Sequence, residues 1–135
     1  MAYILVADDD DVLTEMLRQC LTRAGHEVRC VNDGEQLLDQ VCLRRPDAIL
    51  LDVRLPVLSG METLVELKTH PAHMAIPVIV TTARRSHRDS LSAMRAGAAG
   101  YVTKPFSPEE LALRIESVVT RRRIVTENGD RHSVH

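Results

Sequence analysis

The sequence predicts an α/β domain in which helices cover both faces of a five-stranded parallel sheet, a doubly wound arrangement. Short apolar segments alternate along the chain with longer segments of helical periodicity. Three of the five apolar segments are almost continuously apolar, as expected for strands that are covered on both faces. The length of 135 residues allows about one such domain with one compact core.

Five short segments are predicted to be strands because they are apolar and rich in β-branched residues. In chain order they are YILVA (3–7), EVRCV (27–31), AILLD (48–52), PVIVTT (77–82) and GYVTK (100–104). Each is followed by a segment that suits a helix. Five strand–helix units therefore account for most of the chain.

The first helix is predicted from apolar residues that recur at helical spacing, namely Val12, Met16, Leu17, Cys20 and Leu21. Similar segments occupy about 34–44, 60–69, 87–97 and 107–122. Gly25 and Gly97 are typical of helix C-terminal caps, and the stretch Ser107-Pro108-Glu109-Glu110 is typical of a helix start. These stops and starts separate the helices from the strands.

The composition is that of a globular protein, with 44% hydrophobic and 27% charged residues and a net charge of −2. This balance gives no general electrostatic reason to bind nucleic acid or an anionic membrane. The N-terminus lacks the pattern of a signal peptide, and no stretch approaches 18 apolar residues. We therefore expect a cytoplasmic protein, whose cysteines (Cys20, Cys30 and Cys42) are small buried side chains without a chemical role.

Polar residues stand where the predicted strands end. In a doubly wound sheet the carboxyl ends of the strands lie along one edge, where ligands bind. Residues expected to meet there are Asp8 and Asp9 after the first strand, Asp52 at the end of the third, Thr82 at the end of the fourth and Lys104 at the end of the fifth.

Such a group of carboxylates needs a counter-charge, because neighbouring carboxylates repel one another. Oxygen ligands from two segments suit Mg²⁺, which also bridges to phosphate oxygens. An aspartate beside Mg²⁺ can attack phosphorus and form an acyl phosphate, while Thr82 and Lys104 could bind the oxygens of the transferred group. The residues themselves thus predict a phosphoryl-transfer site.

At these positions the sequence resembles the receiver domain of two-component response regulators. The matching stretches are ILVADDDD, DAILLDVRLPVLSG, IPVIVTTA and GYVTKPFSPEEL, in the family's order and near its spacing, over residues 3 to about 122. The resemblance implies the flavodoxin-like (βα)5 receiver fold. It also implies a receiver domain over residues 1–122, followed by a polar tail or the start of a linker over residues 123–135.

The resemblance implies a role for each residue of the site. Asp52 matches the phosphoacceptor and also binds the metal. Asp9 matches the direct magnesium ligand, Asp8 the acid that acts on the metal through water, and Arg54 the residue whose backbone carbonyl completes the coordination. Thr82 and Lys104 match the pair that contacts the phosphoryl group.

Two further positions follow from the resemblance. Tyr101 matches the aromatic switch residue, whose ring turns inward when the hydroxyl of Thr82 moves toward the phosphate. Pro105 follows the lysine, and in relatives this Lys-Pro bond is commonly cis. Arg54 and Arg84 occupy positions that often tune the lifetime of the phosphate, so we hypothesise that self-dephosphorylation is slow.

The expected partners are also those of the family. A sensor histidine kinase or a histidine phosphotransfer protein would supply the phosphoryl group. The face formed by the fourth helix, fifth strand and fifth helix would act on a downstream effector protein or on a missing C-terminal output domain. We expect no direct nucleic-acid or membrane binding and no turnover of a separate substrate.

Two alternatives have different chemistry. Asp8-x-Asp10-x-Val12 also fits the first motif of haloacid dehalogenase-type phosphatases, with Asp8 as the nucleophile, but the further acidic magnesium motif is missing and DAILLDVRLP is unexplained. A flavin-binding module of the same architecture is disfavoured because aromatic residues make up 2% of the chain and no Ser/Thr/Gly-rich phosphate loop follows the first strand.

Overall fold

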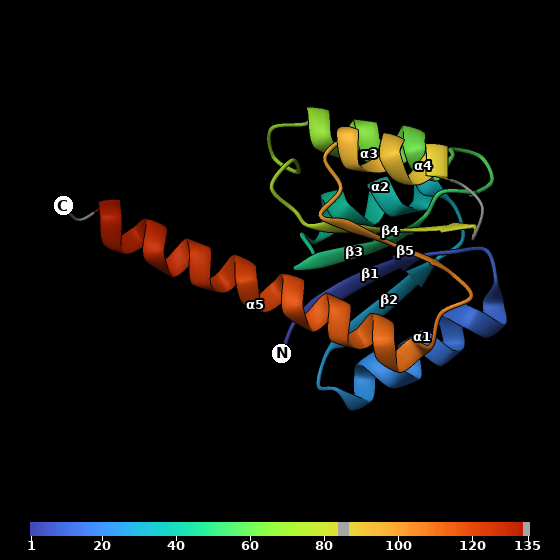
Figure 1. Cartoon of the computed structure of the whole chain (residues 1–135), viewed down its shortest axis with the longest axis horizontal. Coiled ribbons are helices and arrows are strands. Elements are labelled where there is room, and N and C mark those ends of the chain that lie inside the picture. Colours follow the sequence, from blue (N-terminus) through green and yellow to red (C-terminus); the bar gives the residue numbers. More distant parts are fainter. Residues whose placement is uncertain (84–86, 134–135) are drawn as a thin grey trace.

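The computed structural model describes residues 1–83 and 87–133, and within them the side chains of residues 1–83 and 88–121. The chain forms one parallel sheet with the strand order β2-β1-β3-β4-β5 (Figure 1). Its strands are β1 (Tyr3–Ala7), β2 (Glu27–Val31), β3 (Ala48–Asp52), β4 (Val78–Ala83) and β5 (Gly100–Lys104). The predicted fold class is confirmed, and only β4 differs from its predicted bounds, by one residue at each end.

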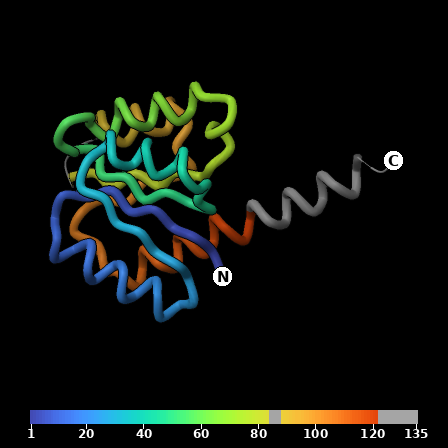
Figure 2. Tube along the Cα trace, turned by 180° about the vertical axis from the view of Figure 1, so that it is seen from behind, coloured from blue at the N-terminus to red at the C-terminus, as the bar shows by residue number. Residues whose placement is uncertain are grey.

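Helices cover both faces of the sheet. They are α1 (Asp11–Arg23), α2 (Gly34–Leu43), α3 (Gly60–Thr69), α4 (His87–Arg95) and α5 (Pro108–Ser133). Helices α1 and α5 lie on one face, and α2, α3 and α4 on the other (Figures 1 and 2). Helix α5 continues past the predicted end near residue 122. Residues 123–133 contain no proline, and the helix-stop signal of Asn128-Gly129 does not end α5 in this structure.

The core has two layers because successive side chains of a strand point to opposite faces of the sheet. In β1, Leu5 packs with the layer beneath α2, α3 and α4, and Ile4 packs with the layer beneath α1 and α5. Strands β1 and β3 are buried along their whole length. Their carboxyl ends, with those of β4 and β5, form the edge of the sheet that we call the carboxyl edge.

The structure confirms the two predicted glycine caps and adds an aspartate cap at the start of α1. The Asp10 side chain caps α1 by accepting hydrogen bonds from the backbone N–H groups of Val12 and Leu13, both at 3.1 Å. Gly25 and Gly97 have φ of 94° and 105°, the left-handed conformation that favours glycine at a helix end. The aspartate run 8–11 is therefore divided, since its second half belongs to the helix start.

The cysteines are free thiols, and one of them does not match its expected burial. Cys20 and Cys30 are partly buried, whereas Cys42 is exposed. The buried face of α2 is formed by Gly34, Leu37 and Val41. Cys42 lies one residue beyond Val41 and is rotated off that face, so the expectation that it is buried was wrong.

Thr81 on β4 offers a stability test, since its hydroxyl is buried and has no hydrogen-bond partner among the described residues. Thr81→Val replaces this hydroxyl by a methyl group of similar size. We expect the free energy of unfolding to rise by about 1 kcal/mol, because an unpaired buried hydroxyl is costly. Urea denaturation would measure it, with Thr22→Val at an exposed position of α1 as the control. A destabilised Thr81→Val protein would show that the hydroxyl has a partner in solution.

Candidate functional site

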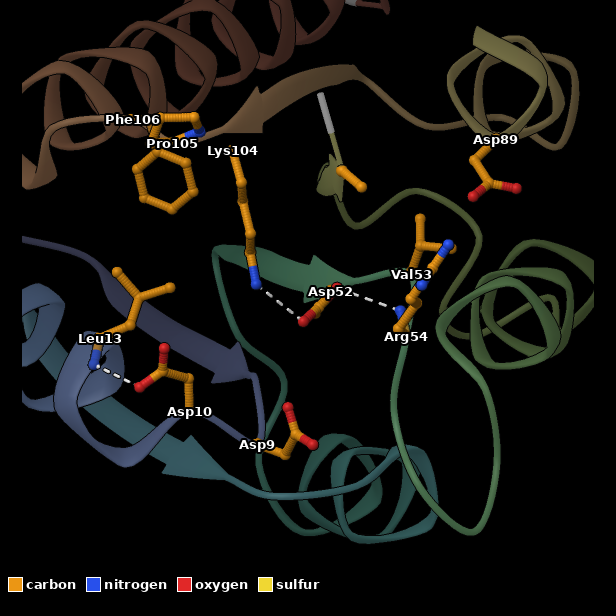
Figure 3. A pocket seen from close by; sticks show the side chains of 11 residues that line it. Asp9, Asp10, Leu13, Asp52, Val53, Arg54, Asp89, Lys104, Pro105 and Phe106 are labelled. Carbon is orange, nitrogen blue, oxygen red and sulfur yellow. Dashed lines mark hydrogen bonds and ion pairs between the residues drawn. The ribbon is translucent and has the colours of Figure 1, made fainter. Parts of the chain in front are cut away.

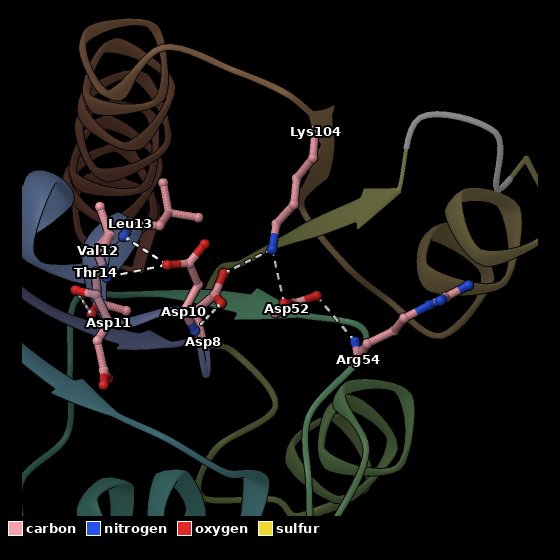
Figure 4. Close-up of polar contacts among 9 residues, drawn as sticks. All are labelled: Asp8, Asp10, Asp11, Val12, Leu13, Thr14, Asp52, Arg54 and Lys104. Atoms are coloured by element: carbon pink, nitrogen blue, oxygen red, sulfur yellow. Dashed lines mark hydrogen bonds and ion pairs between the residues drawn. The ribbon is translucent and has the colours of Figure 1, made fainter.

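Three carboxylates meet at the carboxyl edge. One oxygen each of Asp8, Asp9 and Asp52 lies within 4.8 Å of the others (Figures 3 and 4). Asp8 and Asp52 are only 3% and 7% exposed, whereas Asp9 is exposed. The structure therefore brings together the acids that the sequence predicted to meet.

Backbone N–H groups of the loops after β1 and β3 orient two of these carboxylates. The Asp10 N–H donates to Oδ1 of Asp8 at 2.9 Å, and the Arg54 N–H donates to Oδ1 of Asp52 at 3.0 Å. Asp and Asn side chains commonly accept such bonds from a backbone N–H two residues further along the chain. The loop sequence thus fixes the direction of each carboxyl group.

Lys104, at the end of β5, supplies a counter-charge. Its Nζ lies 3.0 Å from Oδ2 of Asp8 and 2.9 Å from Oδ2 of Asp52 (Figure 4). Burial lowers the pKa of Lys104, but its hydrogen bonds to Asp52 and Asp8 outweigh that effect, so the pKa is raised. The ammonium group therefore stays charged between the two carboxylates.

Burial raises the pKa of the Asp8 carboxyl group. The hydrogen bonds from the Asp10 N–H and from Lys104 oppose this shift only in part, and the charge of Asp52 adds to it. Ionisation of Asp8 in the folded protein therefore has a cost in stability, which a cation bound at this site would offset.

A pH-dependent stability difference follows for Asp8→Asn in metal-free buffer. Because the folded-state pKa of Asp8 is raised, protonation of Asp8 favours the folded state, and that contribution is lost as the pH rises through the folded-state pKa. Asp8→Asn removes this loss. We expect the variant to match wild type in acid and to be more stable than wild type at neutral pH.

Urea denaturation at a series of pH values, with a chelator present, would measure this difference. Asp39→Asn, at an exposed position of α2, is the matched control and should show no such trend. A difference between Asp8→Asn and wild type that stays constant with pH would contradict the prediction.

The donor set fits a divalent cation. Asp8 and Asp9 come from the loop after β1, and Asp52 comes from the end of β3, so carboxylate oxygens converge from two segments. Mg²⁺ prefers such oxygen ligands and keeps several waters. The coordination by the Arg54 carbonyl stays a prediction.

The site opens into a cavity of about 570 Å³ (Figure 3). Its lining comes from the carboxyl edge and the loops that follow it, from α1 and from α4. It consists of Asp9, Asp10, Leu13, Asp52, Val53, Arg54, Ala83, Asp89, Lys104, Pro105 and Phe106. Asp89 and Phe106 were not among the residues predicted from the sequence. The peptide bond between Lys104 and Pro105 is cis, as the resemblance implied.

Two of the predicted residues, Thr82 and Tyr101, are not among the described residues that line this cavity. The Thr82 side chain is buried on β4, and its hydroxyl oxygen lies 3.4 Å from that of Ser90 on α4. Tyr101 is 39% exposed and lines a separate groove over α4, β5 and α5. Arg84 lies outside the described residues, whereas Arg54 lines the cavity, and the hypothesis of slow self-dephosphorylation stays a prediction.

Comparison with known protein families identifies the family of this chain. A family model described as the response regulator receiver domain matches residues 4–116. The chain belongs to this family. The receiver is 40% identical over 118 residues to the response regulator MprA of Mycobacterium leprae, covering 87% of this chain and 51% of that protein.

Two more matches extend the comparison. The receiver is 34% identical over 127 residues to the alkaline phosphatase synthesis transcriptional regulatory protein PhoP of Bacillus subtilis, covering 94% of this chain and 52% of that protein. It superposes on the receiver domain of the Francisella response regulator 1452 with a TM-score of 0.83 and 28% identity, covering 90% of this chain and 98% of that one.

These matches support a two-component response regulator and do not favour the haloacid dehalogenase-type alternative. The chain spans about half the length of the curated relatives it matches. Within the described part of the receiver, no helix is both long and apolar enough to cross a membrane.

Proposed function

We propose that this receiver accepts a phosphoryl group on Asp52 from the phosphohistidine of a sensor histidine kinase or a histidine phosphotransfer protein. The surroundings of the Asp52 carboxylate are the main support for Asp52 as the phosphoacceptor. The Asp52 carboxylate is held between Lys104 and the Arg54 N–H, at the wall of an open cavity, with two further acids within 4.8 Å. This arrangement suits an aspartate that must be both reactive and accessible.

In the proposed step, a carboxylate oxygen of Asp52 attacks phosphorus, the nitrogen–phosphorus bond of the donor breaks, and the imidazole leaves. Lys104 Nζ, already 2.9 Å from Asp52, donates to an oxygen of the transferred group. Mg²⁺ held by Asp8, Asp9, Asp52 and the Arg54 carbonyl would neutralise charge on the phosphoryl oxygens. The product is an acyl phosphate, and the receiver turns over no separate substrate.

The phosphoryl group then acts as a switch. Thr82 turns its hydroxyl toward the new dianion, Tyr101 follows, and the face of α4, β5 and α5 changes. Phosphorylation of this kind biases two existing states, so its effect is limited by the difference in interaction between them. We expect this cytoplasmic receiver to act on a downstream effector protein or on a C-terminal output domain of the same protein. The second option has support from the curated relatives, which are about twice as long as this chain.

The test is the intact mass of the protein after incubation with acetyl phosphate and Mg²⁺. We expect one added phosphoryl group that requires Mg²⁺, disappears in Asp52→Asn and persists in Asp39→Asn. No adduct on wild type, or an adduct that persists in Asp52→Asn, would contradict the proposal.

A further inference from the structure

The hydroxyl of Thr82 faces α4 rather than the cavity. Side chains alternate along β4, and Val78 and Val80 pack in the core layer beneath α2, α3 and α4. Thr82 continues this series, and its Oγ1 lies 3.4 Å from Oγ of Ser90. Thr82 is not among the described residues that line the cavity.

Ser90 is an unusual residue for its place on α4. It is 5% exposed and lies three residues before Ala93, which is fully buried on the same helix. Alanine is a better helix former than serine, and a buried hydroxyl is costly unless it is paired. The Ser90 hydroxyl has a polar contact with the Thr82 hydroxyl, and this contact links α4 to the end of β4.

The contact between the Thr82 and Ser90 hydroxyls is weak enough to be replaced by a hydrogen bond from Thr82 to a phosphoryl oxygen. Its distance of 3.4 Å exceeds the usual separation of about 2.7–2.8 Å for hydroxyl pairs, so the bond is weak. A phosphoryl oxygen on Asp52 would offer Thr82 a charged acceptor, and such charge-assisted bonds are about twice as strong as neutral ones. Phosphorylation would thus draw Thr82 away from Ser90.

We propose that Ser90 is a positioning residue that holds Thr82 against α4 in the unphosphorylated receiver and is released when Thr82 turns to the phosphoryl group. This inference rests on the proposed function and adds a second route from Thr82 to the output face. Helix α4 carries both Ser90 and Met94, and Met94 lines the same groove as Tyr101. Release of Ser90 changes that groove through α4 as well as through the tyrosine.

The experiment is a double-mutant cycle on the initial rate of Asp52 phosphorylation by acetyl phosphate with Mg²⁺. Ser90→Ala leaves the Thr82 hydroxyl without this partner in the resting state only, so we expect the rate to rise about fivefold. The same change in a Thr82→Ala background should have no effect, because the contact is already absent. Ser92→Ala, on the same helix, controls for the gain in helix propensity and should leave the rate unchanged.

Two outcomes would overturn the role of Ser90, and a third would also overturn the proposed function. An equal rate increase in wild-type and Thr82→Ala backgrounds would show a general effect on α4 and overturn the role of Ser90. A wild-type receiver that is phosphorylated on Asp52, with Ser90→Ala no faster than Ser92→Ala, would also overturn it while leaving the proposed function intact. A wild-type receiver without phosphate on Asp52 would overturn both.

Discussion

Lys104→Met is expected to slow phosphorylation of Asp52 by acetyl phosphate by about 100-fold. The substitution keeps the length of the side chain and removes the ammonium group that lies 2.9 Å from Asp52. Removal of one preorganised donor to a developing negative charge commonly costs about 100-fold to 1,000-fold in rate. The initial rate of phosphate incorporation, measured by intact mass at saturating Mg²⁺, reports this loss.

The same substitution should tighten Mg²⁺ binding about tenfold. Lys104 pairs with both Asp8 and Asp52, so it competes with a cation for the carboxylates. Without it, the two acids repel one another and a divalent cation relieves more of that repulsion. Titration calorimetry of the unphosphorylated protein would measure the dissociation constant, and tenfold corresponds to about 1.4 kcal/mol.

These opposite effects separate a direct role of Lys104 from a damaged site. Arg44→Met is the control, because Arg44 lies over the ring of Tyr3, at the other end of the sheet, and its loss changes the net charge equally. We expect both quantities to stay within about twofold in that variant. A Lys104→Met protein that lost both rate and Mg²⁺ affinity would indicate a collapsed site and contradict the prediction.

The strands and the acidic part of the site could be predicted from the sequence because they depend on rules that act over short distances. A strand buried on both faces must be almost continuously apolar, and β1 and β3 are, apart from Asp52 at the end of β3. The parallel topology then brings the strand ends together, so the sequence alone predicts that Asp8, Asp52 and Lys104 meet, as they do in the structure.

Other features depend on tertiary packing, which leaves no local pattern in the sequence. The Thr82 hydroxyl lies 3.4 Å from that of Ser90, on a helix whose position depends on its packing against the core. Asp89 lines the cavity because the packing of α4 places it there. Val57 has a φ of 67°, which lies in the left-handed region. β-Branched residues rarely adopt this conformation, so the sequence does not predict it at Val57.

Gly60→Ala is expected to lower the free energy of unfolding by about 3 kcal/mol. A Cβ at this position would lie 2.0 Å from the carbonyl oxygen of Asp52 and 2.6 Å from Cα of Val53. These are backbone atoms, so no flexible side chain can move aside. The first residue of α3 would have to move away from the end of β3 and weaken the bond that the Gly60 N–H donates to the Val53 carbonyl at 2.8 Å.

Gly100→Ala is the matched control, since a Cβ there would meet no atom within 4 Å. Its free energy of unfolding should stay within about 0.5 kcal/mol of wild type, and urea denaturation of the two variants tests the contrast. Gly60→Ala should also slow phosphorylation, because the displaced backbone carries Asp52. A folded but destabilised Gly60→Ala protein with a normal rate would mean that the loop relaxes without moving the carboxylate. Wild-type stability would mean that α3 does not approach β3 this closely in solution.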